Sequence, residues 1–164
     1  MPKLSQPRYA GVLAEHREQV VLVREEYPRW GGPYWNIPSG RIEDHETPQT
    51  GACRELAEET GLIVAASDLV LVSTSSVASP GRVSRAWNFT VDIEDPRLEV
   101  QDPDGLIQDA RWFPIHEAAA LLRELPYRPL SEPAVALLGG QVRPGGHWAY
   151  SGPESEPALT YPRS

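Results

Sequence analysis

Short apolar runs alternate with turn residues along the chain. The runs Tyr9–Leu13 and Gln19–Val23 are separated by the polar segment 15–18, so they predict two strands joined as a hairpin. Segment 25–40 interleaves Pro and Gly with aromatic residues, which predicts a structured loop with a short extended piece at Tyr34–Ile37. Three more runs predict strands further along the chain: Asp68–Ser73, Ser84–Val91 and Ala110–Phe113.

Helix signals occur at three places. Thr47 offers an N-cap hydroxyl, Pro48 suits the first helical position, and Gly61 is placed as a C-terminal stop, so a helix is expected over Pro48–Thr60. Two further helices are expected at Pro114–Leu125, which ends before a proline, and at Glu132–Leu138. Because strands and helices mix without regular alternation, the predicted class is α/β in the broad sense: α+β, or a layered α/β/α sandwich.

The length of 164 residues predicts one folded domain, which we place at residues 1–138. Segment 139–164 holds five Gly and four Pro, a content typical of irregular chain, so a Gly/Pro-rich C-terminal tail is expected there. Trp148 and Tyr150 within it have two interpretations. Either they dock on the domain or on a second subunit of a homodimer, or they belong to a mobile end.

Charge and cysteine content narrow the function classes. Fifteen Lys and Arg against 23 Asp and Glu give a net charge of −8, which argues against a nucleic-acid-coating protein because such binding depends on cations. No apolar run is long enough to cross a bilayer, and the first residues lack the apolar stretch of a secretory signal. The single cysteine, Cys53, suits a reducing compartment. We therefore expect a cytoplasmic protein with neither nucleic acid nor membrane as partner.

The expected helix at 48–60 carries a cluster of negative charge. Glu55, Glu58 and Glu59 fall within about 100° of one another around the helix axis. Such pairs repel by roughly 0.2–0.5 kcal/mol each, and the C-terminal half of a helix disfavours negative charge further. Arg54 can relieve part of this repulsion by pairing with Glu58. Two interpretations remain: a solvated acidic face, or a site for a divalent cation, since Mg²⁺ prefers carboxylate oxygens.

The spacing around this cluster is specific. Gly40 is followed after five residues by Glu46, and after seven more by the run Arg-Glu-Leu-Ala-Glu-Glu-Thr-Gly-Leu at 54–62. This pattern resembles the Nudix box, and the chain is identified as a member of the Nudix hydrolase family. Segment 35–40 is also similar to the Trp-x-x-Pro-Gly-Gly segment of that family, with Ser39 where many members have Gly.

The resemblance implies a Nudix fold, an α/β/α sandwich with a mixed sheet. It implies that Mg²⁺ or Mn²⁺ is bound by Glu55, Glu58 and Glu59, with help from the carbonyl oxygen of Gly40. It further implies that Glu46 pairs with Arg54 to hold the loop against the helix, while Gly61 has a structural role. The implied reaction is water attack at phosphorus, which breaks a phosphoanhydride of a nucleoside diphosphate linked to another moiety. Within the box, the residues expected to be catalytic are Glu55, Glu58 and Arg54.

The general base and the substrate are less constrained. Glu55 is the first candidate for the base, and Asp102 and Asp104 are alternatives. Candidate substrate contacts are aromatic residues that could stack and arginines that could hold phosphates: Tyr34, Trp35, Trp87, Arg41, Arg82 and Arg85. The candidate substrates are nucleoside triphosphates and ADP-ribose-like compounds, both small nucleotides. The alternative is a domain that binds a nucleotide metabolite as a sensor and does not hydrolyse it.

Overall fold

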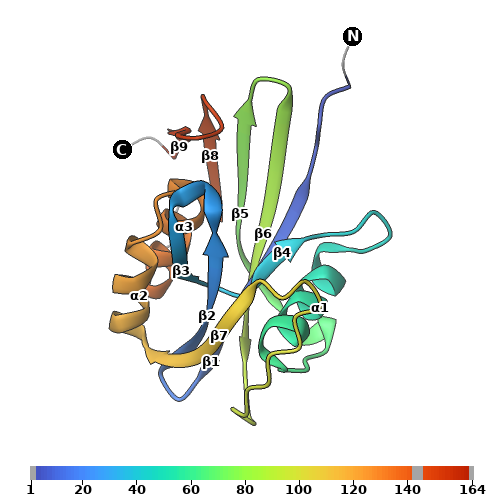
Figure 1. Cartoon of the computed structure of the whole chain (residues 1–164), viewed down its shortest axis with the longest axis vertical. Coiled ribbons are helices and arrows are strands. Elements are labelled where there is room, and N and C mark those ends of the chain that lie inside the picture. The colour runs from blue at the N-terminus through green and yellow to red at the C-terminus, as the bar shows by residue number, and fades with distance from the viewer. Residues whose placement is uncertain (1–2, 142–145, 163–164) are drawn as a thin grey trace.

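One mixed sheet with helices on both faces forms the body of the molecule (Figure 1). The structure is a computed structural model, and it describes residues 3–141 and 146–162. The strands are β1 Arg8–His16, β2 Gln19–Tyr27, β3 Gly32–Asn36, β4 Ser39–Arg41, β5 Val70–Ser79, β6 Arg82–Asp92, β7 Ile107–Pro114, β8 His147–Ser151 and β9 Ala158–Tyr161. The helices are α1 Pro48–Thr60, α2 Ile115–Arg123 and α3 Arg128–Leu138, with short 3-10 turns η1 Pro28–Trp30 and η2 Ala66–Asp68.

The strands follow the order β3-β2-β1-β6-β5-β8-β9, with β4 paired to β1 and β7 paired to β2. The pairs β1–β6 and β5–β8 are parallel, and the other pairs are antiparallel. The predicted hairpin of the first two strands is confirmed. Arg17 and Glu18 form its two-residue turn with φ of 48° and 62°, the sign that tight hairpin turns require.

Alternation along β1 and β2 divides the apolar side chains between two cores. Val12 and Val21 pack with Leu56 of α1 on one face of the sheet. Leu13 and Leu22 pack with α2 and α3 on the other face. Figure 1 shows α1 on one side of the sheet and α2 and α3 on the opposite side. The predicted α/β/α sandwich is therefore confirmed.

Helix α1 has the predicted ends. Thr47 accepts a hydrogen bond from the backbone N–H of Thr50 (3.1 Å), and the Thr50 hydroxyl accepts one from the N–H of Thr47 (2.9 Å), so the two residues form a reciprocal cap. Gly61 ends the helix with φ of 78°, a left-handed conformation that glycine adopts without strain. The start of the helix is thereby fixed close to the loop that carries Glu46 and follows β4.

Strand β2 extends beyond the predicted run, through Arg24 and Glu25 to Tyr27. Residues 25–27 were expected to be loop because proline and glycine interrupt segment 25–40. This part forms a strand because it lies between two partners, β3 on one side and β7 on the other, with a register shift between Arg24 and Glu25. Backbone pairing on both sides makes the extended conformation favourable without an apolar sequence.

The irregular tail expected from residue 139 is wrong for two stretches. β8 runs parallel to β5 and β9 pairs with β8, so both extend the sheet. Trp148 and Tyr150 are 3% and 1% exposed and pack against Val77 and Ala136. The glycine and proline residues Gly152, Pro153 and Pro157 lie between the two strands, so composition gave no sign of the strands that flank them. Residues 142–145 and 163–164 of this segment lie outside the described residues.

No helix in the described ranges is both long enough and apolar enough to cross a membrane.

Candidate active site

Strand β4 brings the glycine of the box against helix α1. Its pairing with β1 places Gly40 opposite Ala10 and Ser39 opposite Gly11. The carboxyl group of Glu55 lies directly against Gly40, in space that a Cβ atom would occupy. The backbone N–H of Ser39 donates a hydrogen bond to Oε2 of Glu59 (3.0 Å). Two of the three glutamates therefore face the backbone of β4.

Arg54 ties the loop to the helix. Its Nε and Nη2 atoms donate to the two carboxylate oxygens of Glu46, both at 2.8 Å, in a bidentate pair. Nη2 also donates to the carbonyl oxygen of Arg41 (2.9 Å), while Nη1 donates to Glu55 (3.0 Å) and Glu58 (3.3 Å). The expected pair of Glu46 and Arg54 is thus present. The Arg54 guanidinium lowers the pKa of Glu46 to about 2.

Glu59 is a buried carboxyl group, only 5% exposed. Burial raises the pKa of Glu59 to about 10, and the negative charges of Glu25 and Glu55 add to this effect. Burial also raises the pKa of Glu55 and of Glu25. Several carboxyl groups are thus buried close together. A bound cation would stabilise such a cluster because it favours the charged forms of the carboxyl groups.

These groups share one hollow of about 480 Å³, which we call the carboxylate hollow. Its acidic lining residues are Glu25, Glu43, Asp44, Glu55, Glu59, Asp102 and Asp104. The carboxylate of Asp102 accepts hydrogen bonds from the backbone N–H groups of Asp104 (3.2 Å), Leu106 (2.6 Å) and Ile107 (3.0 Å), so it also organises the turn before β7. Asp104 is exposed at the rim.

The donor set fits Mg²⁺ or Mn²⁺, because carboxylate and carbonyl oxygens are the ligands these ions prefer. Within residues 3–141 and 146–162, no three acidic, His or Cys side chains are already gathered as ligands around one point. The reason lies in Arg54, which draws Glu58 and Glu55 toward its own Nη1 atom while Glu59 bonds to Ser39. Glu58, whose side chain is 29% exposed, is held by Arg54 and does not line the carboxylate hollow.

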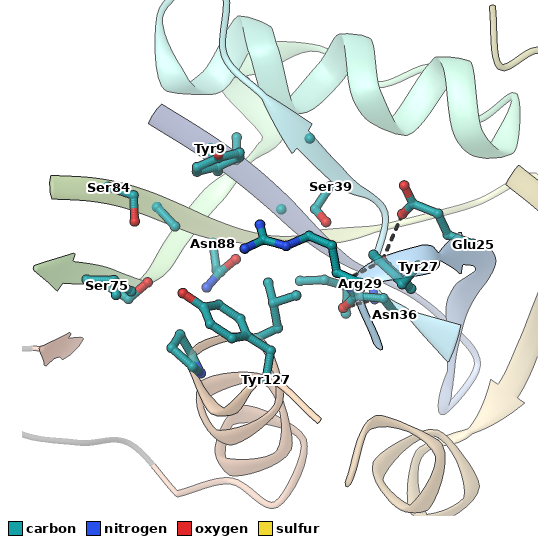
Figure 2. Close-up of a pocket in the computed structure, with 18 of the residues that line it drawn as sticks. Tyr9, Glu25, Tyr27, Arg29, Asn36, Ser39, Ser75, Ser84, Asn88 and Tyr127 are labelled. Atoms are coloured by element: carbon teal, nitrogen blue, oxygen red, sulfur yellow. Dashed lines mark hydrogen bonds between the residues drawn. The ribbon is translucent and has the colours of Figure 1, made fainter. Parts of the chain in front are cut away.

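A second hollow of about 440 Å³ adjoins the first, and Glu25, Ser39 and Gly40 line both. We call it the aromatic hollow, after Tyr9, Tyr27, Trp30 and Tyr127 in its walls. Figure 2 shows the Tyr27 hydroxyl between Glu25, to which it donates a hydrogen bond (2.8 Å), and Asn36, from which it accepts one (3.2 Å). The volume and the mixture of aromatic and polar walls are typical of a small-molecule site.

Only two of the six predicted substrate residues line one of the two hollows. Arg41 lines the carboxylate hollow and Arg82 lines the aromatic hollow. Four others line neither hollow: Tyr34, Trp35, Trp87 and Arg85. Trp35 packs edge-on against Phe113 (4.9 Å between ring centroids), and Tyr34 donates a hydrogen bond from its hydroxyl to the carbonyl oxygen of Trp30 (3.2 Å).

Several site residues were not identified from the sequence. Glu25 and Tyr27 lie on the part of β2 that was expected to be loop. Tyr127 and Glu154 come from the start of α3 and from the connection after β8, far from the box in sequence. The sequence did show an unusual density of aromatic residues at 27–35. The predicted substrate contacts in that segment were Tyr34 and Trp35, whereas Tyr27 and Trp30 line the aromatic hollow.

Comparisons with known proteins point to one family. A family model described as the NUDIX domain matches residues 5–145. The chain is 36% identical over 55 residues to an 8-oxo-dGTP diphosphatase of Proteus vulgaris, a match covering 34% of this chain and 49% of that protein. It is 28% identical over 147 residues to diphosphoinositol polyphosphate phosphohydrolase 3-alpha of Mus musculus, covering 88% of this chain and 84% of that one. This chain thus spans about half the length of the first relative.

A solved structure of a NUDIX hydrolase from Nitrosomonas europaea has the same fold. It superposes with a TM-score of 0.64 at 23% identity, covering 85% of this chain and 93% of that chain.

Proposed function

The chain belongs to the Nudix hydrolase family, and we propose that it cleaves a phosphoanhydride of a nucleoside diphosphate linked to another moiety. The candidate substrates are nucleoside triphosphates and ADP-ribose-like compounds. One observation carries this proposal: the carboxylate hollow and the aromatic hollow meet at Glu25, Ser39 and Gly40. A diphosphate at that junction has acidic side chains on one side and room for an organic group on the other.

Glu55, Glu58 and Glu59, with the carbonyl oxygen of Gly40, would hold Mg²⁺ or Mn²⁺. When bound, the cation supplies charge neutralisation and orientation of the diphosphate oxygens, which an acidic site cannot supply by itself. Glu59 is kept in place by the N–H of Ser39 and Glu55 by contact with Gly40. Arg54 keeps its bidentate pair with Glu46 throughout, so its role is to position the loop and the glutamates.

For the proton of the attacking water, we assign Glu55 as the general base. Its side chain is only 14% exposed and lines the carboxylate hollow against the backbone of Gly40. Asp102 already accepts three backbone hydrogen bonds, and Asp104 lies exposed at the rim. Replacement of Glu55 by Gln should therefore reduce kcat far more than replacement of Asp104 by Asn.

A panel of nucleotides with Mg²⁺ or Mn²⁺ tests the proposal. We expect release of a nucleoside monophosphate or phosphate from at least one nucleoside triphosphate or ADP-ribose-like compound, and loss of that activity in chelator. Tight binding of a nucleotide with no turnover under all metal conditions would support the sensor alternative instead. Full activity in chelator would contradict the role given to the three glutamates.

A further inference from the structure

Two arginines from distant parts of the chain converge on one carboxylate at the aromatic hollow. Arg29 of η1 and Arg82, the first residue of β6, both contact Oε1 of Glu154, at 3.4 Å and 3.1 Å. Arg82 also donates a hydrogen bond from Nη2 to the hydroxyl of Tyr9 (2.7 Å), which fixes its direction. One carboxylate cannot balance two guanidinium groups, so this point keeps a local positive charge in a protein of net charge −8.

The backbone of Arg82 lies well along β6 from the junction of the two hollows. Ser39 is opposite Gly11, and Gly11 is opposite Asn88, so these residues mark the level where the two hollows meet. Arg82 precedes Asn88 by six residues on β6, a backbone separation of about 20 Å at roughly 3.3 Å per residue. The side chain of Arg82 reaches back along part of that length to Tyr9.

The space between these two ends suits an organic group. Tyr27 stacks on Trp30 (4.7 Å between centroids) and Trp30 on Tyr127 (5.6 Å), which builds one wall. Gly11 and Ala86, on neighbouring strands, are among the small residues that line the hollow. Figure 2 shows Arg29 reaching over the hollow with Tyr9 on one side and Tyr127 on the other. A moiety that extends from the diphosphate through this hollow ends at the two arginines.

Glu154 is held weakly enough to be replaced. It lies between β8 and β9 with its side chain 44% exposed, and its partner Arg29 is 70% exposed. Ion pairs of such exposure contribute about 1 kcal/mol or less. A phosphate group carries more charge than a carboxylate and offers more acceptor oxygens to the guanidinium groups. A phosphate group can therefore compete with Glu154 for the two arginines.

We propose that Arg29 and Arg82 form an anion subsite that Glu154 covers in the free protein and that a substrate phosphate occupies in the complex. This inference rests on the proposed function and narrows it. The substrate class is a nucleoside diphosphate compound that carries a further phosphate on the moiety lying in the aromatic hollow. Glu154 lies beyond residue 145, where the match to the family model ends, and it is then a specificity-determining residue.

Steady-state kinetics with three related compounds test the substrate class: ADP-ribose, ADP-ribose 2′-phosphate and ADP-ribose 1″-phosphate. The wild-type protein should have a KM about tenfold lower for one phosphorylated compound than for ADP-ribose, as one or two charge-assisted hydrogen bonds would give. Arg82→Met should remove that preference by raising the KM for the phosphorylated compound to the value for ADP-ribose. Glu154→Gln should lower KM for the same compound. Equal KM values for the three compounds in the wild-type protein would overturn the substrate class.

Calorimetric titration of inorganic pyrophosphate in chelator tests the subsite without turnover. Glu154→Gln should bind pyrophosphate about threefold to tenfold more tightly than the wild-type protein, because the competing carboxylate is gone. Glu156→Gln is the matched control, since it removes one exposed charge from the same connection and touches neither arginine. Arg29→Met removes one of the two arginines at an exposed position and should weaken pyrophosphate binding. It also replaces Arg82→Met in the kinetic experiment if that variant does not fold.

The two experiments separate the proposals. If pyrophosphate binds and responds to Glu154→Gln while no nucleotide is hydrolysed, the proposed function fails and the subsite stands. If nucleotides are hydrolysed but pyrophosphate binding is the same in wild-type, Glu154→Gln and Arg29→Met proteins, the subsite is wrong.

Discussion

The carboxyl group of Glu55 lies against Gly40, so closely that a side chain at residue 40 would overlap it. Gly40 has no unusual backbone conformation, since its φ is not positive. The need for glycine therefore comes from the approach of Glu55 and not from the turn. A glycine in the β4 strand and a glutamate in α1 are thus coupled through space.

Replacement of Gly40 by Ala should displace Glu55 while leaving the fold intact. Because an added methyl group and Glu55 cannot share the space, we expect kcat to fall by about tenfold or more. The unfolding free energy should change by less than about 1 kcal/mol, since only the end of the Glu55 side chain and its pair with Arg54 are displaced. Initial rates and urea denaturation measure the two effects. Gly139→Ala is the control, because a Cβ there meets only ordinary contacts. Unchanged rates in Gly40→Ala would contradict the coupling.

Glu58→Gln separates a metal ligand from a surface glutamate. The lost contact with Arg54 is a partly exposed pair, so the unfolding free energy in chelator should change by less than about 1 kcal/mol. Hydrolysis at saturating Mg²⁺ should fall by on the order of 100-fold or more, because charge stabilisation at phosphorus is lost. Thermal melts and initial rates on the same preparations measure both.

Glu132→Gln is the matched control for this variant. Glu132 also pairs with an arginine four residues away, Arg128, but on α3 and outside both hollows. Its rates should equal those of the wild-type protein. Wild-type rates in Glu58→Gln itself would remove Glu58 from the metal site.

Glu46 makes the fold sensitive to acid. Its pKa is lowered from the usual 4.5 to about 2 by hydrogen bonds from Arg54, so its stabilising contribution is complete above pH 4.5 and is lost as the pH falls toward 2. Glu46→Gln should be less stable than the wild-type protein by about 1.5–3 kcal/mol at pH 6, and this difference should shrink at pH 2.5. Urea denaturation in chelator at both pH values measures it. Glu43→Gln, an exposed change in the same loop, should show no such narrowing.

Loss of the last two strands should destabilise the domain. Trp148 is buried against Val77 and Ala136, so Trp148→Ala should lower the unfolding free energy by about 3–5 kcal/mol, and truncation after Leu138 by at least as much. Denaturant unfolding measures both. Val70→Ala, at a residue 61% exposed on β5, should cost less than about 0.5 kcal/mol. Wild-type stability of the truncated chain would contradict this prediction and show that residues 139–164 are dispensable for folding.

The parts of the fold that could be predicted from the sequence are those with local causes. Helix α1 has the predicted bounds because Thr47, Pro48 and Gly61 act on the backbone within one turn of themselves. Strand β5 was predicted to end at Ser73 but continues to Ser79. Its second half has little apolar alternation because Ser75 lines the aromatic hollow. Val77 also packs against Trp148 of β8, a contact that depends on strand order.

The candidate site likewise has features that could be predicted from the sequence and features that could not. The acidic face of α1 follows from helical spacing, and the Glu46–Arg54 pair was implied by the resemblance to the Nudix box. Glu25 reaches the carboxylate hollow only because β2 pairs with both β3 and β7, and Glu154 reaches Arg82 only because β8 adds to the edge of β5. Such contacts depend on strand order, which local patterns along the sequence do not reveal.

The two hollows are lined by different kinds of element, and this affects how the substrate preference of the enzyme can change. Reactive groups reside on β4 and α1, whereas the far walls of the aromatic hollow come from η1, the start of α3 and the β8–β9 connection. Connections between elements tolerate substitutions and insertions better than the elements themselves. New substrate preferences can therefore arise by exchange of a few surface residues, and a chimaera that receives another protein's residues 152–157 should accept different compounds with an unaltered turnover number.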